Sequence, residues 1–154
     1  MRIVQAKPDD AAALTDIAFA AKRHWGYPER WIEGWRDVLT VRPELIASHE
    51  SYAAILRGRT VGFYTLSRKD DRLDLLHMWV LPDAMGRGVG RSLFMHAIQR
   101  MRELGCQELE IESDPNAEGF YLHMGAHRVG ATIKELDGQR RELPVLIYEI
   151  APVA

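Results

Sequence analysis

Met85-Gly86-Arg87-Gly88-Val89-Gly90-Arg91 is the stretch that decides the fold, because it joins two segments of different periodicity. Before it, residues 73–81 are apolar at most successive positions, which is typical of a strand covered on both faces. After it, apolar residues recur at helical spacing up to Leu104, and Gly105 stands where a helix would end. Residues 108–112 then alternate strictly and predict the next strand. Strand, helix and strand in this order need a right-handed crossover, so the two strands are predicted to be parallel.

The remaining sequence predicts further strands and helices on either side of this unit. Apolar spacing, proline positions and turn residues place them in the following order: a strand at Ile3-Val4, helices near 8–22 and 28–39, a helical turn after Pro43, a hairpin of strands 52–56 and 60–66 about Arg57-Gly58-Arg59, a short helix over 115–124, and strands near 126–135 and 143–150 about the turn Asp137-Gly138.

Composition sets the class of protein. The chain has 154 residues, 47% of them hydrophobic, which predicts a single folded domain over residues 1–154. Twenty Lys+Arg against 22 Asp+Glu leave a formal charge of −2, which favours neither a nucleic acid nor an anionic membrane as partner. One cysteine, Cys106, excludes an internal disulfide and a multi-cysteine zinc site, and the histidine spacing argues for no metal. No apolar run is long enough to span a membrane, so we expect a cytoplasmic protein.

The three glycines at every second position form a candidate phosphate site, which we call the glycine loop (residues 85–91). Without Cβ atoms, successive backbone N–H groups can converge, and the start of the following helix adds unpaired donors. A plain strand-to-helix turn is the alternative, although such a turn needs one glycine rather than three. A dinucleotide fingerprint would need glycine at Arg91, and a P-loop would need lysine there.

Two blocks of sequence resemble the GCN5-related N-acetyltransferase (GNAT) superfamily. In its motif Gln/Arg-x-x-Gly-x-Gly/Ala, backbone amides hold the coenzyme A pyrophosphate; Gly88 and Gly90 match the small positions, whereas Met85 replaces Gln/Arg and offers only its N–H. The second block, residues 114–126, resembles the family's Asn/Asp-x-x-Ala-x-x-Phe/Leu-Tyr-x-x-x-Gly segment. It follows the strand predicted over 108–112, which comes after the helix that begins at the glycine loop (the loop helix). The resemblance covers residues 60–150. The first 50 residues match the family only in the order of their elements.

This resemblance implies the fold and the coenzyme site. The fold would be α/β (mixed α+β), a twisted mixed sheet of six or seven strands with helices on both faces and a central parallel pair that splays apart. The co-substrate would be acetyl-CoA, with its pantetheine arm on the first strand of that pair and no metal. The residues that the resemblance implies for coenzyme binding are Met78, Trp79, Val80, Leu81, Met85, Gly86, Arg87, Gly88, Val89, Gly90, Arg91, Asn116, Phe120 and Tyr121.

Acetyl transfer from a thioester to an amine needs an acid for the leaving thiolate and a base for the amine. A lysine-like amine has a pKa of about 10.4, so about one in a thousand is neutral at pH 7. The resemblance implies that Tyr121 is the acid; the alternative is an aromatic residue that packs beside Phe120. The resemblance also implies that Asp74, six residues before Val80, is the base. The alternative is that Asp74 is a carboxylate at the solvent-exposed end of a strand. His77 is expected to pack under the loop helix as a neutral histidine.

Aromatic residues gather between the first two predicted helices, where the family has one wall of its acceptor site. Trp25 and Tyr27 lie in an irregular stretch and, with His77, are the predicted substrate-binding residues. Trp31 and Trp35 are four apart and are equally explained as core anchors. Aromatic faces attract a compact ammonium group. We therefore expect a small-molecule or peptide amine as acceptor, in preference to a lysine of a folded protein.

The predicted function is acetyl transfer from acetyl-CoA to a primary amine by direct attack in a ternary complex. No residue type argues for an acyl-enzyme intermediate. The alternatives are a non-catalytic CoA sensor or scaffold, a protein-lysine or N-terminal acetyltransferase, and a nucleotide-binding protein. The sequence identifies neither the acceptor nor the acyl-chain preference, and it leaves a homodimer open.

Overall fold

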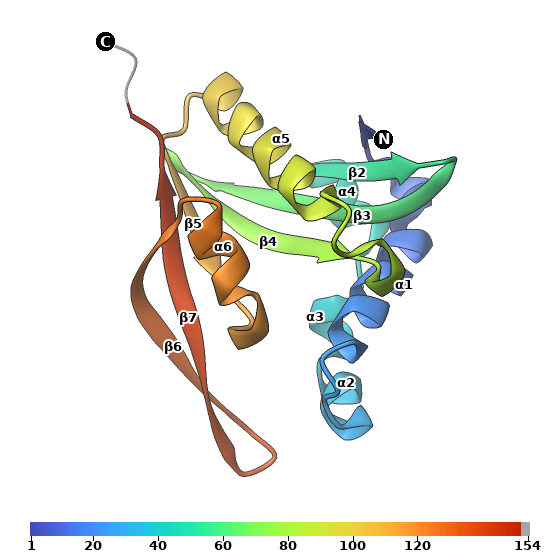
Figure 1. Cartoon of the computed structure of the whole chain (residues 1–154), viewed down its shortest axis with the longest axis vertical. Helices are drawn as coiled ribbons and strands as arrows, with labels where there is room; N and C mark the ends of the chain where they lie inside the picture. The colour runs from blue at the N-terminus through green and yellow to red at the C-terminus, as the bar shows by residue number, and fades with distance from the viewer. Residues whose placement is uncertain (152–154) are drawn as a thin grey trace. The chain divides into compact units, whose positions relative to one another are not determined.

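The computed structural model describes residues 1–151 and contains one seven-stranded sheet in the order β1-β2-β3-β4-β5-β7-β6 (Figure 1). Most neighbouring strands are antiparallel, and β4 with β5 is the parallel pair that the crossover rule predicts. The strands are β1 (Arg2–Gln5), β2 (Glu50–Leu56), β3 (Arg59–Lys69), β4 (Arg72–Val80), β5 (Glu108–Glu112), β6 (His127–Leu136) and β7 (Gln139–Glu149).

The helices follow the predicted order with one interruption. They are η1 (Pro8–Asp10), α1 (Ala11–Arg23), α2 (Glu29–Gly34), α3 (Arg36–Leu39), α4 (Pro43–Ser48), η2 (Pro82–Ala84), α5 (Val89–Leu104), η3 (Pro115–Ala117) and α6 (Glu118–His123). The single helix predicted over 28–39 is wrong, because the chain leaves helical geometry at Trp35, where φ is −92° and ψ is 6°. The Trp35 N–H is shared between the carbonyls of Trp31 and Ile32, which tightens the last turn of α2.

The chain forms two compact units, and we describe each by itself. The first, unit 1, consists of Met1–Leu66 and His77–Ala97, and unit 2 consists of Ser67–Leu76 and Ile98–Ala154. The strands β3 and β4 and the helix α5 each contribute residues to both units. The single-domain organisation stays a prediction.

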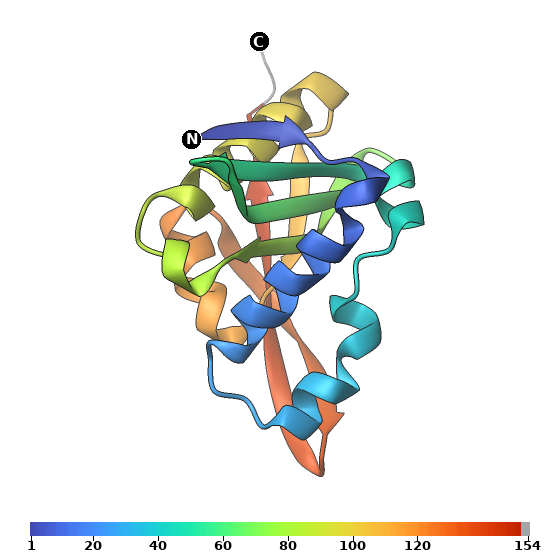
Figure 2. The same cartoon turned by 90° about the vertical axis from the view of Figure 1, so that its right-hand side faces the viewer.

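In unit 1, helices lie on both faces of the strands. Phe63 on β3 belongs to an apolar cluster with Leu14 and Ile17 of α1, which lies in front of the strands in Figure 2. The neighbouring Tyr64 faces the other way and hydrogen-bonds His96 of α5 at 2.7 Å. Gly62 permits this close packing of α5, because a Cβ there would lie 3.0 Å from the Leu93 side chain and 2.9 Å from a backbone carbonyl.

Unit 2 contains the residues that pair between the parallel strands β4 and β5, and it contains the hairpin of β6 and β7. Leu73 pairs with Leu109 and Asp74 with Glu110, and β4 continues beyond this register to Val80. β6 and β7 form the predicted hairpin about Asp137 and Gly138, whose φ angles of 54° and 73° suit a two-residue turn between antiparallel strands.

Candidate active site

The glycine loop has the local geometry that a close backbone approach requires. Gly86 and Gly88 have φ angles of 76° and 80°, in the left-handed region that glycine adopts without steric cost. A Cβ at either position would have no atom within 4 Å among residues 1–151, its chain neighbours excepted. These two glycines are therefore needed for backbone conformation and not for packing inside the chain.

The loop leads directly into α5, which begins at Val89. The Ser92 N–H donates to the Gly88 carbonyl at 3.0 Å, the first hydrogen bond of the helix. The amides of Val89, Gly90 and Arg91 precede that bond and are the donors that a helix start offers to an anion. These amides and the left-handed glycines fit the predicted pyrophosphate site.

The predicted contacts of the pantetheine arm lie at the end of β4 and in the residue that follows it. Met78, Trp79 and Val80 are half-buried on the strand. Leu81 donates its N–H to the Val61 carbonyl at 2.8 Å, and its carbonyl accepts from Ala84 at 2.9 Å. Leu81 therefore ties the end of β4 to β3 and to η2.

His77 is buried on the α1 face of β4. Its ring lies 5.6 Å from the Phe63 ring, and Phe63 belongs to the cluster under α1. The expectation that His77 packs under the loop helix is therefore wrong, although His77 stays a predicted substrate-binding residue. The sequence shows the alternation along the strand but not which face each helix covers.

Burial and one hydrogen bond hold His77 neutral. Removal from water lowers the pKa of His77 to about 4. The Trp79 indole Nε1–H donates to Nδ1 of His77 at 3.0 Å, so Nδ1 is an acceptor and the neutral ring carries its proton on Nε2. This bond orients the Trp79 ring.

Lys22, which the sequence analysis did not single out, lies among the rings of Tyr27, Trp35 and Trp79 in unit 1, which we call the aromatic group. Its Nζ lies 4.2 Å from the ring centroid of Trp35, 5.0 Å from that of Tyr27 and 6.0 Å from that of Trp79. The residue is only 8% exposed. A signal was available, because Lys22 stands four positions after Ala18 on the buried stripe of α1, where a lysine is unexpected.

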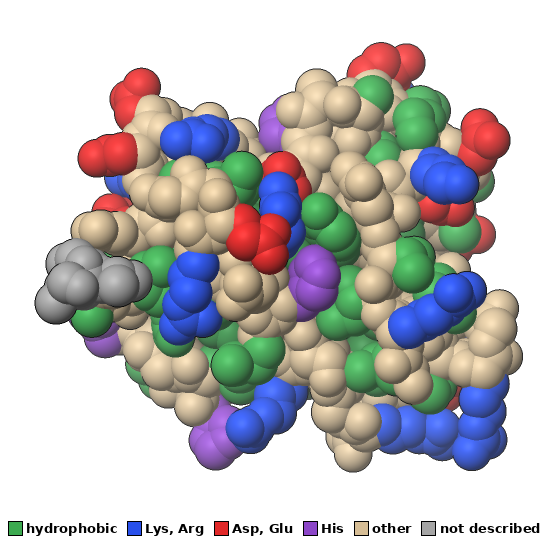
Figure 3. All heavy atoms as spheres, turned by 90° about the horizontal axis from the view of Figure 1, so that it is seen from above, with side chains coloured by type: hydrophobic (Ala, Val, Ile, Leu, Met, Phe, Trp, Pro, Cys, Tyr) green, Lys and Arg blue, Asp and Glu red, His purple; other side chains and the backbone are tan. Residues whose placement is uncertain are grey.

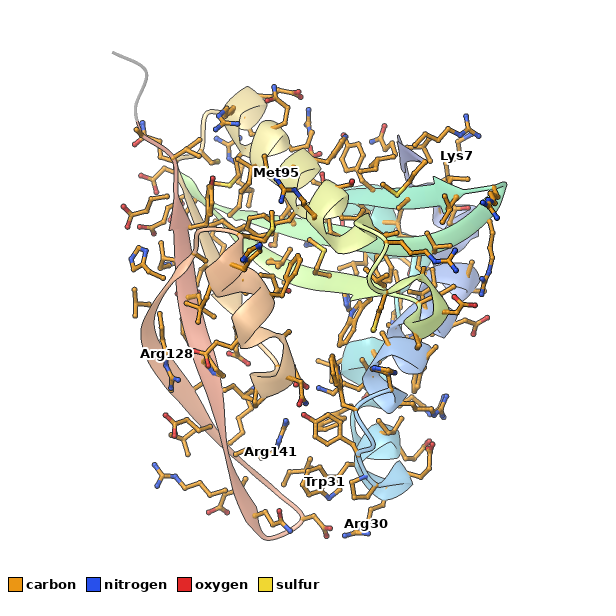
Figure 4. The ribbon with its side chains drawn as sticks, viewed as in Figure 1. Lys7, Arg30, Trp31, Met95, Arg128 and Arg141 are labelled. Atoms are coloured by element: carbon orange, nitrogen blue, oxygen red, sulfur yellow. The ribbon has the colours of Figure 1, made fainter. Side chains whose placement is uncertain are left out.

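The other aromatic side chains of this region differ in exposure. Trp31, on α2, is buried and stacks at 5.9 Å on Tyr27 (Figure 4), as expected of a core anchor. Trp25 is 39% exposed and makes an edge contact with His24 at 4.9 Å. Of the predicted acceptor residues, Trp25 therefore presents the most surface to solvent.

Asp74, the predicted base, is held by two cations in unit 2. Its Oδ2 lies 2.9 Å from Lys69 Nζ, and its Oδ1 lies 3.5 Å from Arg72 Nε. The Nη2 atom of Arg72 lies 3.4 Å from Glu110 Oε2. Oδ1 is buried and has no hydrogen-bond partner within residues 1–151. The ion pairs with Lys69 and Arg72 fix the position of the Asp74 carboxylate.

Tyr121, the predicted acid, lies on α6 in unit 2 and is buried. Burial, followed by the negative charge of Asp114, raises the pKa of its phenol. Phe120 makes an edge contact with the Tyr121 ring at 5.2 Å. The Asn116 side chain donates to Asp114 Oδ1 at 2.9 Å, so this amide helps to fix the turn before α6.

Charged side chains of both signs occur on the molecular surface (Figure 3). On the face that Figure 3 draws, acidic and basic side chains both occur, and Lys and Arg side chains gather at its lower right. Within residues 1–151, no group of three His, Cys, Asp or Glu side chains is placed to hold a metal ion. In the same range, no helix combines the length and the apolar character of a membrane span.

Comparisons with known proteins agree on one family. The acetyltransferase (GNAT) family matches residues 13–126. The peptidyl-lysine N-acetyltransferase YiaC of Escherichia coli (strain K12) is 31% identical over 106 residues, which are 68% of this chain and 69% of that protein.

Two solved structures share the fold. One is a GCN5-related N-acetyltransferase from Rhodopseudomonas palustris, with a TM-score of 0.81 and 22% identity over 97% of this chain and 95% of that one. The other is the PaiA N-acetyltransferase of Thermoplasma acidophilum in complex with coenzyme A, with a TM-score of 0.76 and 18% identity over 97% and 98% of the two chains. Both identities are low, so these two likenesses establish the fold alone.

Proposed function

Because the chain belongs to the acetyltransferase (GNAT) family, we propose that it transfers the acetyl group of acetyl-CoA to a primary amine of a small molecule or peptide. The observation that carries this proposal is the glycine loop, whose left-handed Gly86 and Gly88 lead into the first turn of α5. A loop of this kind binds phosphate oxygens, and membership of the family supports an acyl-CoA as the source of the phosphate.

In the proposed reaction, acetyl-CoA supplies an activated acyl group as a thioester. The glycine loop holds the pyrophosphate, and the backbone from Met78 to Leu81 orients the pantetheine arm. The acceptor nitrogen forms a bond to the carbonyl carbon, and the resulting tetrahedral centre collapses with cleavage of the carbon–sulfur bond. The amine loses a proton, and the leaving thiolate gains one.

Tyr121 is our candidate for the proton donor to the thiolate. Its raised pKa keeps the phenol protonated at neutral pH, so the proton is available in every turnover. A thiol titrates near 8.5, so the transfer from the phenol is uphill. We therefore expect the proton to move as negative charge develops on sulfur rather than before.

Asp74 is our candidate for the base, acting directly or through a water. Its buried Oδ1, which has no hydrogen-bond partner within residues 1–151, offers an acceptor site. The ion pairs with Lys69 and Arg72 hold the carboxylate in place, so Asp74 suits the positioning of a water as well as proton abstraction.

The acceptor wall is proposed at Trp25, Tyr27 and His77, with Trp25 as its exposed member. The Lys22 ammonium already lies over the rings of Tyr27 and Trp35. A second cation would meet that charge, so these two rings do not offer the attraction expected of open aromatic faces. We therefore assign the first contact with the acceptor to Trp25.

A lysine side chain of a protein is the second candidate acceptor. The observation that favours it is the similarity to a peptidyl-lysine N-acetyltransferase at 31% identity. This candidate uses the same coenzyme site and the same proton transfers, and it differs only in the size of the acceptor.

The test is thiol release from acetyl-CoA across small amines, polyamines, amino acids, peptides and folded proteins. We expect turnover with at least one amine, and Tyr121→Phe should lower it by about 10- to 1,000-fold with little change in acetyl-CoA affinity. Turnover on folded proteins alone would favour the second candidate. Acetyl-CoA binding without turnover on any amine would instead identify a sensor or scaffold.

A further inference from the structure

A basic pocket in unit 1 is not used by any step of the proposed reaction. It has a volume of about 260 Å³ and lies where the β2–β3 hairpin meets the segment before α5. Three guanidinium groups and one carboxylate line it, for a net charge of +2. The lining residues are Leu56, Arg57, Arg59, Val61, Asp83, Ala84 and Arg87.

One ion pair inside the pocket fixes its frame. Arg59 Nη1 lies 2.9 Å from Asp83 Oδ2, which ties the hairpin to η2 and neutralises one of the three arginines. Within residues 1–151, the guanidinium groups of Arg57 and Arg87 make no hydrogen bond and no ion pair. The remaining positive charge of the pocket is therefore available to a ligand.

The backbone at Arg57 supports a role for its side chain. Arg57 and Gly58 form the hairpin turn with φ angles of 52° and 76°. The other two non-glycine residues with positive φ within residues 1–151 are Asp70 and Asp137, and aspartate suits this conformation. Arginine has no local advantage at such a turn, so a role of the guanidinium in binding is consistent with its place there.

We propose that Arg57, Arg59 and Arg87 bind a phosphate monoester. Guanidinium groups match phosphate oxygens with two parallel hydrogen bonds, and a doubly charged monoester suits a pocket of this charge. The volume is below the 300–1,000 Å³ typical of pockets that enclose a whole ligand, so the pocket takes one end group of a larger molecule.

The monoester is the 3′-phosphate of coenzyme A, an assignment that rests on the proposed function. Arg87 is a member of the glycine loop and also lines the pocket. One ligand with a pyrophosphate and a terminal monoester can therefore occupy both features of the same segment. A separate phosphorylated molecule is the other source of the same chemistry, and the experiment distinguishes the two.

Calorimetry with coenzyme A and with dephospho-coenzyme A tests the assignment. Arg57→Asn is the decisive variant, because asparagine accepts the left-handed turn and removes the charge. We expect the wild type to bind coenzyme A about tenfold or more tightly than dephospho-coenzyme A, and Arg57→Asn and Arg87→Gln each to lose about tenfold for coenzyme A only. The control Arg42→Gln removes the same charge from an exposed site outside the pocket and should change neither affinity.

Equal wild-type affinities for the two coenzymes, or an equal loss of both in Arg57→Asn, would overturn the assignment. Inorganic phosphate should bind the wild type saturated with dephospho-coenzyme A but not with coenzyme A; binding in both cases would identify a separate molecule as the source. A wild type that binds neither coenzyme contradicts the proposed function instead. Phosphate titrated into the wild type and Arg57→Asn then still decides whether the pocket takes a phosphate.

Discussion

His77 and Trp79 stand two positions apart on β4, and their side chains therefore share one face of the strand. The indole N–H of Trp79 can donate only to a histidine whose Nδ1 is unprotonated. The Trp79 ring centroid in turn lies 6.0 Å from the Lys22 ammonium. The charge state of the His77 ring is therefore linked, through Trp79, to the packing of the aromatic group.

The titration of His77 should make the stability of the protein depend on pH. The unfolded chain binds a proton on this histidine below pH 6.5, whereas the folded chain resists protonation until about pH 4. Stability is therefore fully present above pH 6.5 and falls as the pH drops from 6.5 towards 4, by about 3 kcal/mol in total.

Denaturant unfolding of wild type and His77→Gln between pH 4 and pH 7.5, a range spanning the titration, measures this dependence. The wild type should lose more stability than His77→Gln across the interval. The exposed His123, changed to Gln, should leave the wild-type slope unaltered. Parallel curves for wild type and His77→Gln would show that His77 titrates normally in the folded state.

At the scale of elements, we expect the glycine loop and the first turn of α5 to bind the anion together. The left-handed glycines turn the chain, and the first turn of the helix supplies the donors. Because a Cβ at Gly88 would have no atom within 4 Å among residues 1–151 other than its chain neighbours, a substitution there acts through backbone strain and through the ligand.

Gly88→Val should weaken acetyl-CoA binding by about tenfold or more, because a β-branched residue is strained at positive φ and its Cβ faces the phosphate. Gly88→Asn, which tolerates this φ, should keep the stability of the fold and separate the two causes. The matched control is Gly138→Val, which has the same kind of φ at the β6–β7 turn in unit 2. Calorimetry that finds unchanged affinity in a folded Gly88→Val would refute the pyrophosphate assignment.

At the scale of the whole molecule, the chemistry available to the chain favours direct transfer. Its one cysteine, Cys106, is completely buried. A buried thiol without a basic neighbour in sequence is an unsuitable nucleophile. We therefore expect both substrates to be bound together before the first product leaves.

Initial-rate kinetics should show intersecting rather than parallel double-reciprocal lines when acetyl-CoA and acceptor are varied together. Cys106→Ala should retain turnover and cost about 1 kcal/mol of stability through the small cavity it leaves. Parallel lines, or a covalent acetyl-protein that forms without acceptor, would require an acyl-enzyme and another nucleophile.

Local patterns predicted much of this molecule because their causes are local. The hairpin at Asp137-Gly138 follows from turn residues that accept positive φ, and the end of α5 before Gly105 follows from the same preference. The prediction failed at Trp35, where a residue of good helical spacing leaves the helix. Its ring packs against Trp31, Tyr27 and the Lys22 ammonium, and these contacts come from more than one element.

By itself, the sequence determined the order of elements, the parallel pair and the glycine loop, because periodicity, turn chemistry and the handedness of a crossover act over short stretches of chain. The tertiary structure alone decided which face of β4 His77 occupies, that Lys22 fills the aromatic group, and that three arginines share one pocket. These features depend on contacts between residues far apart in the chain. A side chain's neighbours across an interface are set by packing, which no local pattern specifies.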